Sequence, residues 1–123
     1  MSIFELAARH GEWLAARQSV AAANIANADT PAYRARAVGA FETTLQSLQI
    51  GLAATHRSHL TLPAAAVAPP GIDVARSRDA SHSGNTVNIE TELLTIGENG
   101  RMQALDTGIT KTFHRMLLAS LKG

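Results

Sequence analysis

Residues 2–34 read SIFELAARHGEWLAARQSVAAANIANADTPAYR, and this stretch predicts one long helix that ends at a proline turn. Its apolar residues recur at spacings of three and four, which places them in one stripe along a helix. These residues are Ile3, Leu6, Ala7, Trp13, Leu14, Val20, Ala21 and Ile25. The polar residues His10 and Arg17 interrupt the stripe. Because Pro31 disfavours helical backbone in the residue before it, we expect the helix to cover residues 2–28.

A second long helix is expected near the other end of the sequence, over residues 88–121. Apolar residues there step alternately by three and four, which is the seam of a coiled coil. The seam consists of Met102, Leu105, Ile109, Thr112 and Met116, broadened by Phe113 and Leu117. Gly97, Gly100 and Gly108 lie inside this pattern, and each costs about 1 kcal/mol relative to alanine in a helix. Either the helix breaks near Gly100, or the glycines allow another backbone to come close.

The segment between the two helices is expected to be largely irregular. Phe41, Leu45, Leu48 and Leu52 are spaced for a short helix, and a brief strand is expected near residues 72–75. Proline, glycine and small polar residues punctuate the rest without a sustained period. The sequence therefore predicts a mainly α fold, in which the long N- and C-terminal helices pack as an antiparallel coiled-coil pair beside a variable middle segment. The divisions of this one structural domain are 1–30 for the N-terminal helix, 31–87 for the middle and 88–123 for the C-terminal helix.

Length and composition exclude several classes of protein. The 123 residues suit one domain, and a net charge of +1 gives no basic surface for nucleic acid. Apolar residues make up 46% of the chain but aromatic residues only 4%, so we expect a thin core. The longest wholly apolar run is Ala64–Ala68, far below the roughly 20 residues that cross a bilayer, so no membrane insertion is expected. The absence of cysteine excludes disulfides and thiol catalysis.

Candidate chemical sites are few in this sequence. His56 and His59 are the histidine pair nearest to metal-ligand spacing, but they have no carboxylate close by and lack the glutamate of a zinc-protease motif. Neither a nucleophile elbow nor a phosphate-binding glycine loop occurs. We therefore expect no enzyme activity, no cofactor and no metal site.

Three blocks of the sequence resemble one known family. They are residues 22–34 (AANIANADTPAYR), residues 84–92 (GNTVNIETE) and residues 113–123 (FHRMLLASLKG). In these blocks the chain is similar to the bacterial flagellar basal-body rod proteins, and most of all to the proximal rod member of that family. Alanine stands at position 32, where the family usually has glycine. Because alanine rarely adopts a positive φ, we expect no left-handed turn at Ala32.

The resemblance implies a structural role. A member of this family is expected to be a subunit of the basal-body rod, which spans the periplasm and transmits motor torque for motility, and to polymerise through its terminal helices. The implied partners are other rod subunits, the basal-body components at the rod base and the flagellar type III export apparatus, which needs no cleaved signal peptide. The residues alone leave open a soluble helical adaptor or export chaperone, because such a protein would have the same apolar seams.

Amide-rich residues at the end of the first helix are candidate contacts to a neighbouring subunit. Helix capping explains Asn27 and Asp29, but it does not explain Asn24, which is a poor helix former inside the last turns. The apolar seam near the C-terminus is a second candidate surface, since a thin core cannot hide all of it. The expected subunit-interface residues are Asn24, Ile25, Asn27, Asp29, Thr30, Pro31, Tyr33, Leu105, Ile109, Phe113, Met116 and Leu117.

Overall fold

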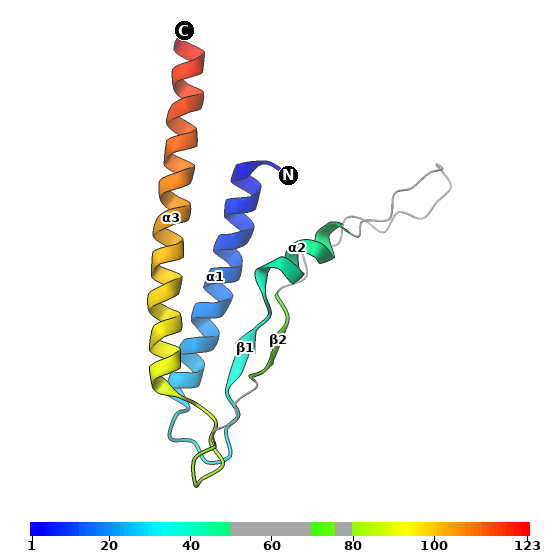
Figure 1. The fold of residues 1–123 in the computed structure, drawn as a ribbon, viewed down its shortest axis with the longest axis vertical. Helices are drawn as coiled ribbons and strands as arrows, with labels where there is room; N and C mark the ends of the chain where they lie inside the picture. Colours follow the sequence, from blue (N-terminus) through cyan, green and yellow to red (C-terminus); the bar gives the residue numbers. More distant parts are fainter. Residues whose placement is uncertain (50–69, 76–79) are drawn as a thin grey trace, which may run out of the picture.

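Two long helices lie side by side and form most of the molecule (Figure 1). This computed structural model describes residues 1–49, 70–75 and 80–123, so the histidine pair His56 and His59 lies outside the described residues. The elements are α1 (Ile3–Ala26), β1 (Arg36–Val38), α2 (Phe41–Gln49), β2 (Ile72–Val74) and α3 (Ile89–Lys122). The N-terminus before α1 and the C-terminus after α3 lie at the same end of the helix pair, so the two helices are antiparallel. The expected mainly α fold with paired terminal helices is therefore confirmed.

The first helix, α1, begins and ends with side-chain caps. Ser2 Oγ accepts the backbone N–H of Glu5 (3.1 Å), and the Glu5 carboxylate accepts the backbone N–H of Ser2 (2.8 Å). This hydrogen bond from the Ser2 backbone lowers the pKa of the exposed Glu5 carboxyl. At the other end, the Asn27 side-chain amide donates to the carbonyl of Ala23 (2.8 Å). The helix ends at Ala26, slightly before the expected position.

The turn after α1 contains a left-handed alanine, which contradicts the expectation from the sequence. Ala32 has a φ of +60°. Its N–H donates to the Ser83 carbonyl (3.0 Å), and the adjacent Tyr33 carbonyl accepts the N–H of Thr86 (3.1 Å). A left-handed conformation costs an alanine roughly 1–2 kcal/mol, and these hydrogen bonds to the segment before α3 offset that cost.

A two-stranded antiparallel sheet follows the turn. β1 pairs with β2 so that Arg36 lies opposite Val74 and Val38 lies opposite Ile72. The strand expected near residues 72–75 is therefore confirmed. The sequence did not predict β1, because three residues are too few to show a two-residue period.

The short helix α2 begins at Phe41, as the spacing predicted, and is described as far as Gln49; Leu52 lies outside the described residues. Trp13 connects α1 to this part of the chain. Its indole N–H donates to the Gly39 carbonyl (2.8 Å), and its ring centroid lies 5.8 Å from that of Phe41. These contacts hold the start of α2 against the middle of α1.

The last helix, α3, is continuous through its glycines. Of the two alternatives left open by the sequence, a break near Gly100 is thereby excluded. A Cβ atom added at Gly97, Gly100 or Gly108 would meet nothing within 4 Å outside its own helix. Packing inside the described chain therefore does not require glycine at these positions.

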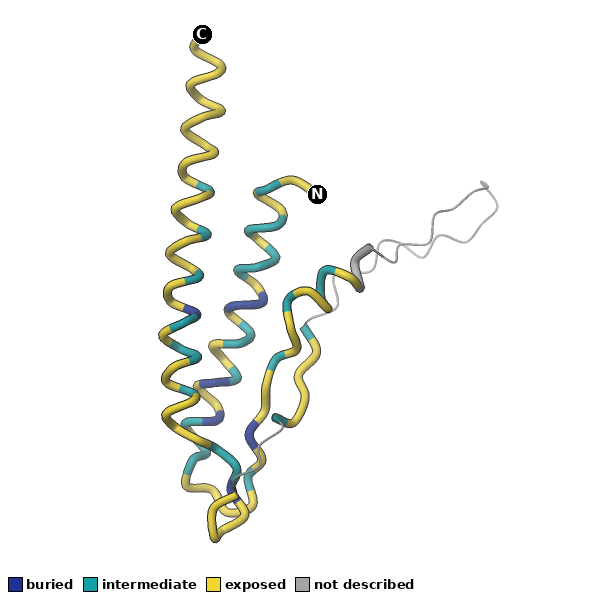
Figure 2. The backbone as a smooth tube through the Cα atoms, in the orientation of Figure 1, coloured by how far each residue is buried: buried dark blue, intermediate teal, exposed yellow. Residues whose placement is uncertain are grey.

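Few positions are buried (Figure 2), and several of the buried side chains are amides. Among the described residues, the buried apolar side chains are Trp13, Leu14, Ala21 and Ala35. The buried polar side chains are Asn24, Asn85 and Asn99. Buried positions lie along α1, at Asn99 within α3 and near the turn, whereas the C-terminal end of α3 is exposed throughout (Figure 2). The expected thin core is therefore observed in the part of the chain that the structure describes.

Candidate functional site

Polar side chains join α1 to α3 along the middle of the helix pair. His10 Nδ1 lies 2.6 Å from Asp106 Oδ2. One heptad further along α1, the Arg17 guanidinium donates to Glu98 Oε2 (2.8 Å) and to Asn99 Oδ1 (3.1 Å). The two residues that interrupt the apolar stripe of α1 are therefore contacts to α3.

Asn24 connects three parts of the chain. Its Nδ2 donates to the Arg36 carbonyl (2.8 Å) and to Glu92 Oε1 (3.0 Å). Its Oδ1 accepts the Arg36 N–H (3.0 Å) and the Tyr33 hydroxyl (3.3 Å). The residue is 0% exposed, so it offers no surface to a second subunit. We therefore correct the expectation that Asn24 is a subunit contact: its amide joins α1, β1 and α3 within one chain.

A second buried amide, Asn85, closes the turn against the segment before α3. Its Nδ2 donates to the carbonyls of Asn27 (2.9 Å) and Thr30 (2.7 Å). Two of the sequence blocks that carry the family resemblance, residues 22–34 and 84–92, therefore bind each other. Asn85 was not among the candidate residues, although its place in the second block was a signal that could have identified it.

The other candidate residues near the turn differ in exposure. Ile25, Asn27 and Tyr33 are half-buried. The exposed candidates are Asp29, Thr30 and Pro31. The Thr30 hydroxyl donates to Asn27 Oδ1 (3.2 Å), which holds the turn in place. The three exposed residues are the part of the turn that another protein can reach.

The face of α3 that contacts α1 matches only part of the seam that the apolar spacing predicted. Asn99, Met102 and Asp106 lie on this face, whereas Leu105 and Thr112 are exposed. Polar residues occupy every seventh position of the contact face. A pattern built only on apolar residues therefore misses the polar positions of this face.

The last turns of α3 extend beyond the start of α1 (Figure 1). In the register set by His10 and Asp106, Ile3 lies opposite Phe113. Residues 113–122, which we call the overhang, therefore extend for roughly 15 Å without α1 beside most of them. Its large apolar side chains are Phe113, Met116, Leu117, Leu118 and Leu121, with exposed fractions between 41% and 82%. Phe113 and Leu117 follow Asp106 by about two and three helical turns, so they continue the face that α1 covers.

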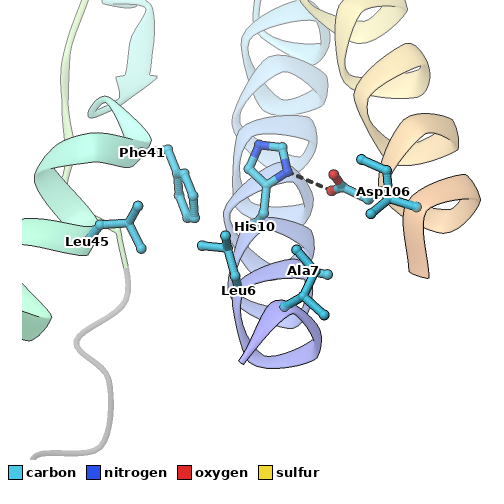
Figure 3. A pocket seen from close by; sticks show the side chains of 8 residues that line it. Leu6, Ala7, His10, Phe41, Leu45 and Asp106 are labelled. Carbon is cyan, nitrogen blue, oxygen red and sulfur yellow. Dashed lines mark hydrogen bonds and ion pairs between the residues drawn. The ribbon is translucent and has the colours of Figure 1, made fainter. Parts of the chain in front are cut away.

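An apolar cavity of about 260 Å³ lies between α1, α2 and α3 (Figure 3). It is lined by Ile3, Leu6, Ala7, His10, Phe41, Leu45, Asp106 and Ile109. His10 lies between Asp106 and Phe41, and its ring centroid is 4.8 Å from that of Phe41. Ile109 lines the cavity one helical turn before the overhang begins. The cavity and the overhang are therefore neighbouring parts of one apolar surface.

The described geometry offers surfaces for packing: the overhang, the cavity and the exposed turn. Within residues 1–49, 70–75 and 80–123, no group of three or more His, Asp or Glu side chains is placed to hold a metal ion. The helices in these ranges also include none that is long and apolar enough to cross a membrane.

Glu92 is expected to make the stability of the chain depend on pH. Burial raises the pKa of its carboxyl, and the hydrogen bond from Asn24 opposes this shift. Because the folded state then holds the proton more tightly than the unfolded state, the contribution of Glu92 to stability falls as pH rises above its ordinary pKa. Glu92→Gln should therefore be more stable than the parent at pH 7, and the difference should shrink towards pH 4.

Urea unfolding at several pH values measures this difference in free energy. The matched control is Glu90→Gln, which makes the same change of charge at an exposed position of the first turn of α3. The prediction would be contradicted if the difference in free energy of unfolding between the parent and Glu92→Gln stayed constant from pH 4 to pH 7.

A family model matches the part of the chain that forms the second half of α1 and the turn. Residues 14–34 match the family described as flagella basal body rod protein. The matched stretch contains Asn24 and the residues that Asn85 binds. The family match therefore covers the part of the hydrogen-bond network that lies in α1 and the turn.

Curated relatives extend the match over the whole chain. The flagellar basal body rod protein FlgB of Agrobacterium fabrum is 39% identical over 126 aligned positions, covering 99% of this chain and 94% of that protein. The FlgB proteins of Salmonella typhimurium and Escherichia coli are 39% and 40% identical, and each alignment covers 69% of this chain and 67% of the relative. Since this likeness includes both terminal helices and the turn between them, the chain belongs to the FlgB family of flagellar basal body rod proteins.

Proposed function

We propose that this structural subunit of the proximal flagellar rod joins its neighbours through the overhang of α3 and the exposed turn after α1. The overhang carries the proposal, because its large apolar side chains are 41–82% exposed. Fully burying one side chain of this size is worth about 1.5–3 kcal/mol. A neighbour that covered Phe113, Met116 and Leu117 would gain much of its binding energy there.

The exposed turn supplies a second and more polar part of the proposed interface. Its reachable residues are Asp29, Thr30 and Pro31. Asn24 is no longer included, since its hydrogen bonds are made inside the chain. The proposed interface residues are Ile25, Asn27, Asp29, Thr30, Pro31, Tyr33, Leu105, Ile109, Phe113, Met116 and Leu117.

The positions of the two surfaces favour an open polymer. The turn and the overhang lie at opposite ends of the helix pair (Figure 1). A contact between the overhang of one copy and the turn region of the next joins two different surfaces, and such contacts can repeat without closing. This geometry suits a rod that spans the periplasm and transmits motor torque. The proposed partners are other rod subunits, the basal-body components at the rod base and the type III export apparatus, which would take the subunit without a cleaved signal peptide.

Removing the overhang tests the proposal. A chain truncated after Thr112 should fold as the parent does, because the deleted side chains are exposed. It should be secreted but should build no rods when it replaces the parent in cells. Electron microscopy of isolated basal bodies and detection of the secreted subunit give the two readouts, with the full-length chain as control. Normal rods in the truncated strain would overturn the proposal. A parent protein that stays in the cytoplasm as a closed oligomer would also overturn it, because an adaptor or chaperone would behave in that way.

A further inference from the structure

Exposed apolar side chains lie at both ends of α3, and the proposed interface includes only those at the C-terminal end. Near the first residue of the helix, Ile89, Leu93 and Leu94 are 47%, 56% and 75% exposed. They belong to the first two turns of α3, which lie beside the turn after α1 and at the opposite end of the helix from the overhang (Figure 1). We call Ile89, Glu90, Leu93 and Leu94 the start surface.

The start surface points away from α1. The hydrogen bond between Glu92 and Asn24 marks the side of α3 that faces α1. Leu93 follows Glu92 by about 100° around the helix and Leu94 follows it by about 200°. Packing between the two helices therefore leaves both leucines uncovered, in agreement with their exposed fractions.

The charges along α3 change sign from one end to the other. Residues 89–100 contain three glutamates and no basic residue, whereas residues 107–122 contain no acidic residue. The exposed basic side chains of this second range are Lys111, His114, Arg115 and Lys122. Such charges stabilise the ends of a helix through its dipole. The dipole gives no reason for exposed leucines beside them, whereas burial against a partner does.

Charge distinguishes the three ways in which two copies can join these apolar surfaces. Contact between two overhangs brings Arg115 and Lys122 of both copies together, and contact between two start surfaces brings Glu90 of both copies together. Like charges oppose each of these contacts. Contact between an overhang and a start surface brings opposite charges together. Because it joins two different surfaces, this third contact can also repeat without closing.

We infer that the overhang of one copy packs on the start surface of the next copy, with the two α3 helices running in the same direction. The inference rests on the proposed function, which gives the overhang a part in assembly, and it names the surface that receives the overhang. Apolar residues recur every four positions on both surfaces, so their side chains form rows that can pack side by side. These rows are Ile89 with Leu93, and Phe113 with Leu117 and Leu121.

Two introduced cysteines test the contact, because the chain has no cysteine of its own. Leu94→Cys and Ser120→Cys in one chain place an exposed thiol on each surface. The two thiols lie roughly 39 Å apart on one α3, so they cannot react within a chain. A short bis-maleimide bridges thiols that are close but not in direct contact, so the test does not depend on one axial position. In isolated basal bodies we expect a ladder of linked dimers, trimers and larger multimers of this chain.

The cysteine variant is checked for swimming before it is cross-linked. If it does not swim, Thr91→Cys, at another exposed position of the first turn of α3, takes the place of Leu94→Cys. The same pair is also cross-linked in the concentrated purified chain, which requires no rod.

The controls move or remove one thiol. Leu94→Cys with Thr107→Cys keeps two exposed thiols on α3 but takes one off the overhang, and its yield of multimers should fall to background. Ser120→Cys alone should give no dimer above background. Dimers of this single variant would overturn the inference, since two overhangs would then meet. Links from the cysteine pair to a different protein in place of the ladder would also overturn it, since the occupant would not be a second copy.

An exchange of charge tests the direction of the contact in the same cysteine background. Glu90→Arg alone and Arg115→Glu alone should each lower the yield of multimers about fivefold, because an attraction becomes a repulsion at every contact. The two changes together should restore the yield to within about twofold of the parent. Both changes oppose the helix dipole, so recovery in the double exchange cannot come from a more stable helix. A double exchange that yields no more multimers than either single one would contradict the inference.

Failure of the inference and failure of the proposed function give different results. If the chain truncated after Thr112 builds no rods, and rods of the cysteine variant give no ladder, the proposed function stands and the inference fails. If the ladder forms and the truncated chain still builds rods, the contact exists but assembly does not need the overhang, and the proposed function fails.

Discussion

Asn24→Leu is expected to lower the free energy of unfolding of the chain by about 2–4 kcal/mol. The substitution removes an amide that is 0% exposed and leaves the N–H and C=O of Arg36 without their partner. The Tyr33 hydroxyl and the Glu92 carboxylate lose their hydrogen bonds to the same amide. Urea unfolding of the purified chain, followed by far-UV circular dichroism, measures the loss.

Two neighbouring substitutions on α1 and its cap serve as controls. Ala22→Leu changes an exposed position and should stay within about 0.5 kcal/mol of the parent. Asn27→Leu removes the cap on the Ala23 carbonyl and should cost about 1 kcal/mol. If Asn24→Leu has the same free energy of unfolding as the parent and yet builds no rods, Asn24 acts between subunits. Its internal hydrogen bonds would then not explain the loss of rods.

Phe113→Asp and Leu117→Asp are expected to abolish swimming while leaving the folded chain almost as stable as the parent. Both side chains are about half exposed in the single chain, so a carboxylate there remains solvated. In an assembled interface the same carboxylate would be removed from water without a partner, which costs several kcal/mol at every contact. Swimming in soft agar, together with detection of the secreted subunit, measures the effect.

Thr107→Asp is the matched control, since it adds the same charge to an exposed position whose hydroxyl bonds only to its own helix, at the Gln103 carbonyl. It should swim normally. Ile109 is unsuitable for this comparison because it lines the cavity beside Asp106, where a second carboxylate would disturb the single chain. If all three aspartate variants swim, or if none does, the overhang has no special part in assembly.

The helices were predictable from the sequence because apolar spacing and capping act over a few residues. The turn and the strand before α2 were harder to predict. Ala32 is left-handed in a turn that residues from the segment before α3 bind, and no local pattern reports such a distant partner. β1 exists for the same reason: its three residues are held by β2 and by the Asn24 amide.

The contact between α1 and α3 was predicted only in part, because its most informative residues are polar. His10 and Arg17 resembled interruptions of a stripe, and Asn24 resembled an exposed contact. Their common spacing of seven residues, matched on α3 by Asn99 and Asp106, was present in the sequence. Hydrophobic periodicity could not reveal it, since that method gives weight to apolar residues alone.

The length of the overhang limits how strongly two free subunits can bind each other. The overhang continues a helix of 34 residues, but most of its turns have no second helix beside them and gain little stability from packing. We expect these turns to fray in a free subunit, so that a neighbour has to order them as it binds. Ordering costs roughly 1–2 kcal/mol in backbone entropy for each residue that has frayed, so ordering about three frayed residues already offsets much of the gain from burying Phe113 and Leu117. Pairing in dilute solution is therefore weak, and incorporation becomes favourable at a growing end, where several neighbours cover one overhang together.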